Sequence, residues 1–363
     1  MEVRRPAIDK RCILCYDKHI NFIRKDLFMN KILKTALIVL GALVALVLLL
    51  LIGVKVGEKL RYLSFYTNAN KEFAMPGRSD NLVQQGMVYL EDEERFLICG
   101  YMSDDTSSRV YVVSEDGEVL SYSELRNADG SAYLGHTGGI EVYKNNVYIT
   151  EGTPEQGYDG GLDVFPLDQI LAGSKAVNTV GRVKTYNNPA FCHIYGDHML
   201  VGEFYRELDY ETALSHRMTT PAGDSNTALI TVFRLDDSEL GISGAPVAGI
   251  TTTGAVQGMY TLDGKEIVIS TSWGLTSSHL YFYDMEKITQ TEGTVSVDGN
   301  ELPIYHLDSA SLVHTAELPP MAEELVYKDG KIFVLNESAC NKYIYGKFMS
   351  GNHLYSYDYK PKQ

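Results

Sequence analysis

The stretch GGIEVYKNNVYITEG, residues 138–152, decides the fold. Apolar residues alternate with other residues on both sides of the tripeptide KNN (144–146), whose composition is typical of a tight turn. This alternation is typical of half-buried antiparallel strands, so the stretch predicts a β-hairpin. Four other parts of the chain have the same form.

The predicted hairpins recur along residues 85–338, each with a turn between its first and second strand. The turns are EDEER (91–95), KNN (144–146), YGDH (195–198), LDGK (262–265) and KDGK (328–331). Equivalent positions in the first strands are Gly86, Gly139, Phe191, Gly258 and Glu324, which lie 53, 52, 67 and 66 residues apart. A third strand such as SSHLYFYD (277–284) follows each hairpin, and a fourth strand follows it in every unit but the last. Internal repeats of this length predict a repeat architecture.

The last unit lacks a fourth strand, because only five residues follow its third strand, GNHLYSYD (351–358). The segment 71–76 precedes the first unit and has no other partner, so we expect it to supply the missing outer strand. Closure of this kind removes exposed sheet edges. The sequence therefore predicts an all-β fold, a β-propeller of five four-stranded blades closed by an N-terminal strand. Six blades are the alternative, because spacings of 67 and 66 residues leave room for irregular structure.

One segment outside the repeats is apolar without alternation. Nineteen residues without a charge lie between Ala36 and Val54. At about 1.5 Å per residue, a helix of this length crosses roughly 30 Å of hydrocarbon. A buried helix of a soluble protein would carry a polar face. The sequence therefore predicts one transmembrane helix over residues 35–56, ahead of the propeller.

The flanks of this helix predict its orientation. Nine Lys and Arg residues precede it, which favours a cytoplasmic N-terminus. No small-residue cleavage site follows it, which favours an uncleaved signal-anchor. We expect a cytoplasmic tail (1–34), a stalk (57–72) and an extracytoplasmic propeller (73–363), held at the cell membrane by a single pass. A further hypothesis is that translation starts at Met29 and that residues 1–28 are a mis-assigned extension.

The two parts of the chain carry opposite charge. Residues 1–61 have a formal charge of +7 and residues 62–363 one of −22. The acidic part argues against a nucleic-acid-binding protein, since phosphate neutralisation needs a basic surface. It would also repel polyanionic polymers, so neutral or cationic partners are expected. Five Cys in 363 residues are too few for a disulfide scaffold, although pairing of Cys340 with Cys99 or Cys192 is left open.

Five phrases of the repeats are distinctive. They are HTGGIEVYKNNVYIT (136–150), PAFCHIYGDHMLVGEFYR (189–206), HRMTTPAGDSNTA (216–228), STSWGLTSSHLYFYD (270–284) and ESACNKYIYGK (337–347). They resemble a group of exported, membrane-anchored bacterial β-propeller proteins of unassigned function, and the likeness spans nearly all of residues 73–358. The resemblance implies a β-propeller fold and an exported, membrane-anchored location. It assigns no catalytic residue to this chain.

An antiparallel meander places the start of each first strand and the end of each second strand at the same end of a blade. Polar side chains at these positions, and on the long loop after residue 203, are therefore expected to ring one mouth of the propeller. Converging polar groups are the default hypothesis for a ligand site. A structural lining that bonds to water is the alternative. The candidate residues are Gln85, His136, Glu151, Glu203, Arg206, Gln257, Glu323, Glu324 and Glu337.

This mouth predicts a protein of the cell envelope that binds a glycan or a protein partner. One alternative is a glycoside hydrolase, which needs two carboxyl groups roughly 5–9 Å apart across the bond. Another is a structural scaffold without catalysis. The sequence contains no dinucleotide or phosphate-binding fingerprint and no EF-hand loop, so no cofactor is expected. A single Ca²⁺ held by carboxylates at the mouth is a weaker hypothesis.

Overall fold

The computed structural model describes residues 10–152, 160–288, 290–338, 340–343, 346 and 351–359. The chain divides into two compact units, Met1–Gly57 and Glu58–Gln363. The described part of the first unit is helical, and the second unit is built mainly of strands.

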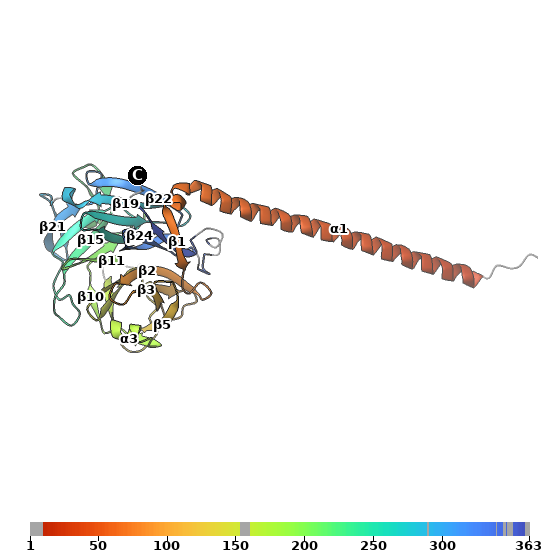
Figure 1. Ribbon diagram of the computed structural model, residues 1–363, viewed down its shortest axis with the longest axis horizontal. Coiled ribbons are helices and arrows are strands. Elements are labelled where there is room, and N and C mark those ends of the chain that lie inside the picture. The colour runs from red at the N-terminus through yellow and green to blue at the C-terminus, as the bar shows by residue number, and fades with distance from the viewer. Residues whose placement is uncertain are drawn as a thin grey trace, which may run out of the picture. The chain divides into compact units, whose positions relative to one another are not determined.

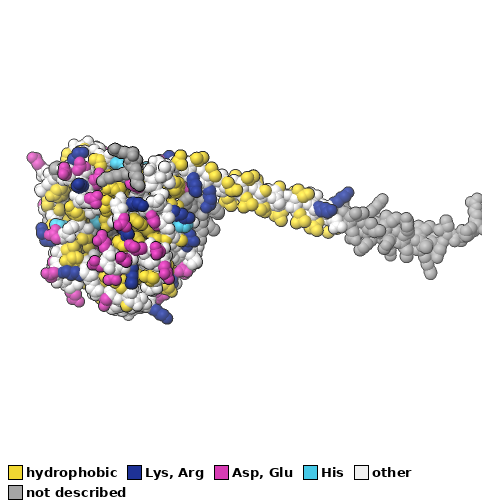
Figure 2. Space-filling view, in the orientation of Figure 1, with side chains coloured by type: hydrophobic (Ala, Val, Ile, Leu, Met, Phe, Trp, Pro, Cys, Tyr) yellow, Lys and Arg dark blue, Asp and Glu magenta, His cyan; other side chains and the backbone are white. Residues whose placement is uncertain are grey.

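Helix α1 (Lys10–Arg61) contains the apolar segment. Its part from Met29 to Arg61 is long and apolar enough to cross a membrane, by length and composition, and its most apolar stretch is not buried inside the protein. Figure 2 shows apolar side chains along the visible side of the apolar stretch of this helix, with basic groups at the two ends of that stretch. The predicted N-terminal apolar helix is confirmed.

The second unit is a ring of sheets, and its described strands form five blades whose innermost strands contact one another around an axis. From the centre outward, blade 1 consists of β2 (Leu82–Leu90), β3 (Arg95–Met102), β4 (Arg109–Ser114) and β5 (Val119–Arg126). Blade 2 consists of β6 (Ile140–Tyr143), β7 (Asn146–Glu151), β8 (Gly161–Pro166) and β10 (Gly181–Lys184). Blade 3 consists of β11 (Pro189–Tyr195), β12 (His198–Glu203), β15 (Ala228–Arg234) and β16 (Ala248–Thr252). Blade 4 consists of β17 (Val256–Leu262), β18 (Glu266–Thr271), β19 (Ser278–Asp284) and β22 (Leu312–Leu318).

Blade 5 joins the two ends of the propeller sequence. It consists of β23 (Ala322–Lys328), β24 (Lys331–Asn336), β25 (His353–Tyr357) and β1 (Ala69–Ala74). Strand β1 pairs antiparallel with β25, with Ala69 opposite Tyr357 and Lys71 opposite Tyr355. Figure 1 shows β1 beside the C-terminal blade, next to strands from the other end of the chain. The five-bladed propeller and its closure by an N-terminal strand are confirmed.

The long spacings hold extra elements rather than a sixth blade. Strands β20 (Thr294–Val297) and β21 (Asn300–His306) leave blade 4 and extend blade 3, where β21 runs parallel to β16. Strand β9 (Ala176–Asn178) runs parallel to β5 at the edge of blade 1. The remaining short elements are α3 (Leu167–Leu171), a 3₁₀ turn at Leu214–His216, β13 (Met218–Thr219), β14 (Ser225–Asn226) and a 3₁₀ turn at Met285–Lys287.

Apolar cores lie between neighbouring blades, and each sheet contributes side chains to two of them. In β3, Phe96 and Ile98 belong to the core shared by blades 5 and 1. Leu97 and Cys99 belong to the core shared by blades 1 and 2. Successive residues of a strand point to opposite faces, so a sheet buried on both faces needs a continuous apolar run such as FLIC. The cores between blades 2 and 3, 3 and 4, and 4 and 5 complete the ring.

The segment expected as a stalk (57–72) holds the end of α1, helix α2 (Leu63–Asn68) and the start of β1. Tyr62 and Phe65 are buried in the core between blades 4 and 5. The Phe65 ring stacks on Tyr357, with 5.6 Å between the ring centroids. This segment is therefore packed on the sheets of the propeller.

Candidate functional site

Three of the innermost strands carry a β-bulge at the same place. In blades 1, 3 and 4, one residue near the start of the first strand has no pairing partner on the second strand. These residues are Gln85, Ala190 and Gln257. A bulge re-aims a side chain and is frequent beside binding sites. All three residues face one cavity near the axis of the ring.

Blades 5 and 2 have related irregularities at the equivalent place. In blade 5, Glu323 and Glu324 together span a shift in register between Ala322 and Leu325. In blade 2, the backbone N–H of Gly138 donates to the Thr150 carbonyl and that of Gly139 donates to Thr150 Oγ1. Each blade therefore presents an irregular backbone position to the same end of the ring.

The cavity has a volume of about 600 Å³, within the usual range of small-molecule sites. Five of the nine candidate residues predicted from the sequence line it. They are Gln85, His136, Glu151, Gln257 and Glu337. The structure thus brings together residues that are up to 252 positions apart in the chain.

Glu337 lines the cavity and is hydrogen bonded to Glu323, which is buried and is not among the described residues that line the cavity. Gln257 Nε2 donates to Glu323 Oε1 at 3.4 Å, and Gln85 Nε2 donates to Glu337 Oε2 at 2.9 Å. Burial raises the pKa of Glu337 to about 7. Burial and the neighbouring Glu337 raise the pKa of Glu323 well above its ordinary value. The pair therefore holds a shared proton near neutral pH.

Glu151 lines another wall of the cavity, at the end of β7. Burial raises its pKa to about 7, against the opposing effect of the backbone N–H groups of His136 and Thr137. Its Oε2 atom is buried and, among the described residues, has no hydrogen-bond partner. A carboxyl group with a pKa near 7 can give or accept a proton at physiological pH.

An aromatic wall forms where blades 3 and 4 meet the cavity. It consists of Phe204, Tyr210 and Trp273, whose ring centroids lie 5.3 to 5.9 Å apart. The Arg206 guanidinium lies over the Trp273 ring at 4.1 Å and forms an ion pair with Asp209. Arg206 therefore supports the aromatic wall and is not among the described residues that line the cavity.

A second aromatic group lies on the side of blades 1 and 2. Tyr101 and His136 stack with 4.6 Å between their ring centroids. The Lys342 ammonium donates a hydrogen bond of 2.6 Å to Tyr101 Oη and lies 4.7 Å from the centre of that ring. Burial and the Lys342 charge lower the pKa of His136, so its ring is neutral at pH 7 even though it is accessible from the cavity.

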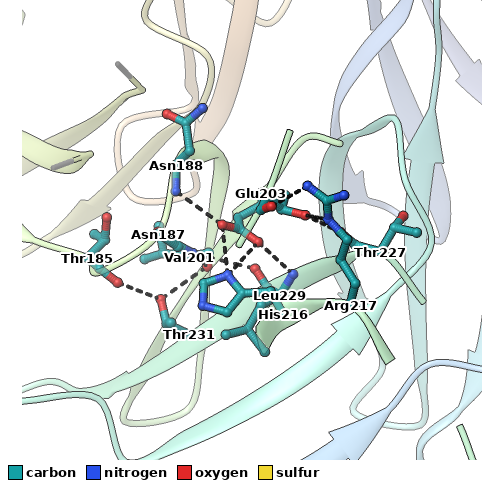
Figure 3. Close-up of polar contacts among 11 residues, drawn as sticks. Thr185, Asn187, Asn188, Val201, Glu203, His216, Arg217, Thr227, Leu229 and Thr231 are labelled. Carbon is teal, nitrogen blue, oxygen red and sulfur yellow. Dashed lines mark hydrogen bonds and ion pairs between the residues drawn. The ribbon is translucent and has the colours of Figure 1, made fainter. Parts of the chain in front are cut away.

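Glu203 does not line the cavity, although it lies at the end of β12 as expected. Its carboxylate is buried and accepts hydrogen bonds from the backbone N–H of Asn188 (3.3 Å) and of Leu229 (3.0 Å). His216 Nδ1 lies 3.0 Å from both of its oxygens. Figure 3 shows these contacts converging on Glu203. Glu203 therefore fastens the loop 204–226, which carries Phe204 and Tyr210 of the aromatic wall.

Glu324 also lies away from the cavity lining. Its Oε1 atom accepts hydrogen bonds from the backbone N–H groups of Met259 and Leu325, at 3.3 and 3.1 Å. Burial raises its pKa well above the ordinary value. Its contacts join blades 4 and 5.

The aromatic wall was not predicted from the sequence. Trp273 is the only Trp in the chain and lies two residues beyond the end of β18, the second strand of blade 4. Its place just past a strand end on the mouth side is the signal that could have identified it. Phe204 and Tyr210 carry no such signal, because they lie on a loop whose path depends on Glu203 and His216.

The sequence left a Ca²⁺ site and a disulfide open. Among the described residues, no group of three or more His, Cys, Asp or Glu side chains is arranged to hold a metal ion. Cys99, Cys192 and Cys340 are buried free thiols. The pairing of Cys340 with Cys99 or Cys192, which the sequence left open, is therefore absent from the structure.

No protein-family model matches the chain, and no curated protein sequence matches it. Similar solved structures include a protein of unknown function from Bacteroides caccae (14% identity, TM-score 0.34, covering 66% of this chain and 73% of that one). Others are the PQQ-bound aldose sugar dehydrogenase of Streptomyces coelicolor (15%, 0.39, 74% and 76%) and an exo-β-1,3-galactanase of Phanerochaete chrysosporium (11%, 0.43, 74% and 60%). With TM-scores below 0.5, these likenesses carry no inference about function, and the fold assignment rests on the strand order.

Proposed function

We propose that this protein is a single-pass membrane protein whose extracytoplasmic propeller binds a glycan at the cell envelope, in the cavity at the mouth of the ring. The observation that carries the proposal is the combination of an aromatic wall with carboxyl and amide groups around one cavity of about 600 Å³. The tail before α1 is proposed to lie in the cytoplasm.

The lining suits a sugar. A pyranose ring has apolar C–H faces that pack on an aromatic ring and hydroxyl groups at its edges that need donors and acceptors. Trp273 offers the aromatic surface, and Gln85, Gln257 and Glu337 offer both kinds of polar group. Glu151 adds a buried oxygen without a partner among the described residues. A ligand hydroxyl at this oxygen would satisfy a group that is costly to leave unbonded.

The membrane assignment is supported by α1 and by the charge of its flanks. The apolar part of the helix is exposed along its length, and a soluble domain would gain nothing from such a surface. Nine Lys and Arg residues precede the apolar run, which favours retention of that side in the cytoplasm.

A glycoside hydrolase is the second candidate, and one observation favours it. Glu151 has a pKa raised to about 7, as a general acid requires. Glu323 is a poor partner for a catalytic pair, because it is buried, is hydrogen bonded to Glu337 and is not among the described residues that line the cavity. A hydrolase would therefore pair Glu151 with Glu337.

Replacement of Trp273 tests the binding site. We expect the full-length chain in detergent micelles to bind a subset of a glycan array, and Trp273→Ala to weaken that binding at least tenfold, because the ligand loses its aromatic contact. Tyr195→Ala is the matched control, since Tyr195 is 39% exposed against 38% for Trp273 and lies at the far end of its strand from the cavity. Affinities would be measured by isothermal titration calorimetry with the glycans found on the array.

Two results would contradict glycan binding. Absence of saturable binding across the array would overturn glycan binding and leave a protein partner or a structural scaffold as the interpretation. Equal losses in the Trp273 and Tyr195 variants would show that the cavity is not the site. Chromogenic glycosides would be assayed in parallel, and turnover abolished by Glu151→Gln would make the protein a hydrolase.

A further inference from the structure

Lys342 differs from the other cations near the cavity in how it is held. Its ammonium donates one hydrogen bond to Tyr101 Oη and lies 4.7 and 5.4 Å from the ring centres of Tyr101 and Tyr343. The Tyr101 and Tyr343 hydroxyl groups are hydrogen bonded to each other. An ammonium has three hydrogen-bond donors. The two tyrosine rings fix the position of the Lys342 ammonium, and the hydrogen bond to Tyr101 uses only one of its donors.

Among the described residues no carboxylate forms an ion pair with Lys342, since none lies within 4.0 Å of its ammonium, although its charge acts to lower the pKa of Glu337. The two arginines on the neighbouring loop differ, because Arg206 pairs with Asp209 and Arg217 with Glu211. An unpaired cation is unexpected in a part of the chain whose formal charge is −22. Lys342 lines the cavity and is accessible to solvent.

The acidic side chains nearby are engaged with one another instead. Glu337 accepts from Gln85 Nε2 and is hydrogen bonded to Glu323. Burial raises the pKa values of Glu151 and Glu337 to about 7 and that of Glu323 well above its ordinary value, so their neutral forms predominate below pH 7. His136 is neutral as well. The Lys342 ammonium is therefore the charge that a ligand in the cavity meets first.

We propose that the glycan bound in the cavity carries a single carboxylate, as in a terminal uronic acid, and that this carboxylate pairs with the Lys342 ammonium while the sugar packs against the Trp273 side. This inference rests on the proposed function and specifies its ligand class. A charge-assisted hydrogen bond to an ammonium is worth more than a neutral one. A single carboxylate matches the single positive charge of Lys342. A polyanion would be repelled by the acidic surface of the propeller.

The test compares glycans that differ only in this carboxylate. Full-length protein in detergent micelles would be titrated with matched pairs of oligosaccharides, each a neutral glycan and its counterpart with the terminal hexose oxidised to the uronic acid. We expect the acidic member to bind roughly tenfold more tightly at pH 6.5. Lys342→Met should remove this preference, so that the ratio of the affinities for the two members falls to about one. Lys342→Arg should preserve the preference.

Lys175→Met provides the matched control. Lys175 is exposed on the outer part of the propeller, so its loss changes the net charge by the same amount at a distance from the cavity. The Lys175→Met variant should keep the preference for the acidic member. This result would separate the effect of a local contact from that of the electrostatic field of the whole protein. Thermal unfolding of each variant would confirm that the fold is unchanged.

The outcomes distinguish this inference from the proposed function. If neutral glycans bind and Trp273→Ala abolishes their binding, but Lys342→Met leaves the acid-to-neutral ratio unchanged, the single-carboxylate inference is wrong and glycan binding stands. If no member of any pair binds, both are wrong. Binding of acidic peptides but of no glycan would also overturn both, even if it depends on Lys342.

Discussion

Single residues show how burial sets the charge of the cavity. Glu151, Glu323 and Glu337 would be ionised on an ordinary surface at pH 7, but their pKa values are all raised, and burial is the largest cause in each case. The hydrogen bond between Glu323 and Glu337 stabilises one proton between two carboxyl groups. The cavity is therefore less negative than its composition suggests.

The raised pKa of Glu151 predicts a pH dependence of stability. Its pKa is 4.5 when unperturbed and about 7 in the folded protein, so the folded state binds more protons than the unfolded state between these values. The free energy of unfolding should fall as pH rises across this window, by on the order of 3 kcal/mol for this group, and should level off above it. Glu151→Gln should remove that part of the slope. Urea unfolding of the full-length chain at pH 5, 6, 7 and 8 would measure it.

Glu337 also makes the free energy of unfolding fall as pH rises, and it does so in both wild type and Glu151→Gln. The difference between the two slopes therefore reports on Glu151 alone. Glu286→Gln, at an exposed site, serves as the control and should leave the slope as it is. Parallel pH profiles for wild type and Glu151→Gln would show that the Glu151 carboxyl group is not held in its neutral form.

At the scale of the element, the first strand of each blade combines an irregular residue with a close approach to the next blade. A Cβ atom at Gly86 would lie 2.9 Å from the backbone nitrogen of Ile140, and one at Gly139 would lie 2.8 Å from Phe191 Cα. Because backbone atoms form these contacts, no side-chain rotation can relieve them. The repeat positions found in the sequence are thus contact points between blades.

Gly139→Ala should therefore destabilise the propeller. The added methyl group pushes the backbones of blades 2 and 3 apart, which we expect to cost about 1–3 kcal/mol of unfolding free energy. Gly244→Ala is the matched control, since nothing lies within 4 Å of a Cβ atom there. Chemical denaturation of both variants would measure the difference, and equal stability of the two would refute a tight approach between these blades.

At the scale of the whole molecule, the ring is closed by pairing of strands from distant parts of the chain. Phe73 of β1 lies in the core between blades 5 and 1, where its ring centroid is 5.6 Å from that of Phe96. This contact joins the first strand of the propeller sequence to the first blade, while the backbone of β1 pairs with β25. Each blade depends on its neighbours for burial, so closure should make unfolding cooperative.

Phe73→Ala should destabilise the entire ring although it lies in an outermost strand. Removing a buried Phe costs about 3–5 kcal/mol, and the loss should appear as a lower midpoint of one unfolding transition. Lys71→Ala, at an exposed position of the same strand, should change the midpoint little. Calorimetry and fluorescence would follow the transition. A separate early transition in the Phe73 variant would indicate that β1 closes the ring only weakly.

Periodic alternation and turn composition were enough to predict the five blades and the closing strand, because both depend on the local rule that successive strand residues face opposite sides. The β20–β21 hairpin could not be placed in this way. In this hairpin, β21 pairs in parallel with β16 of blade 3. A parallel pairing between strands distant in the chain leaves no local pattern in the sequence.

The sequence by itself determined the repeating strands, the apolar helix and the set of polar residues at one end of the ring, since each follows from the order of neighbouring residues. Only the tertiary structure decided which of those residues share a cavity. Glu203 and Glu324 occupy the same kind of strand position as Glu151 and Glu337, yet both are bound by backbone N–H groups within and between blades. Side-chain direction, burial and hydrogen-bond partners depend on packing between blades, and that packing brings together residues that are far apart in the sequence.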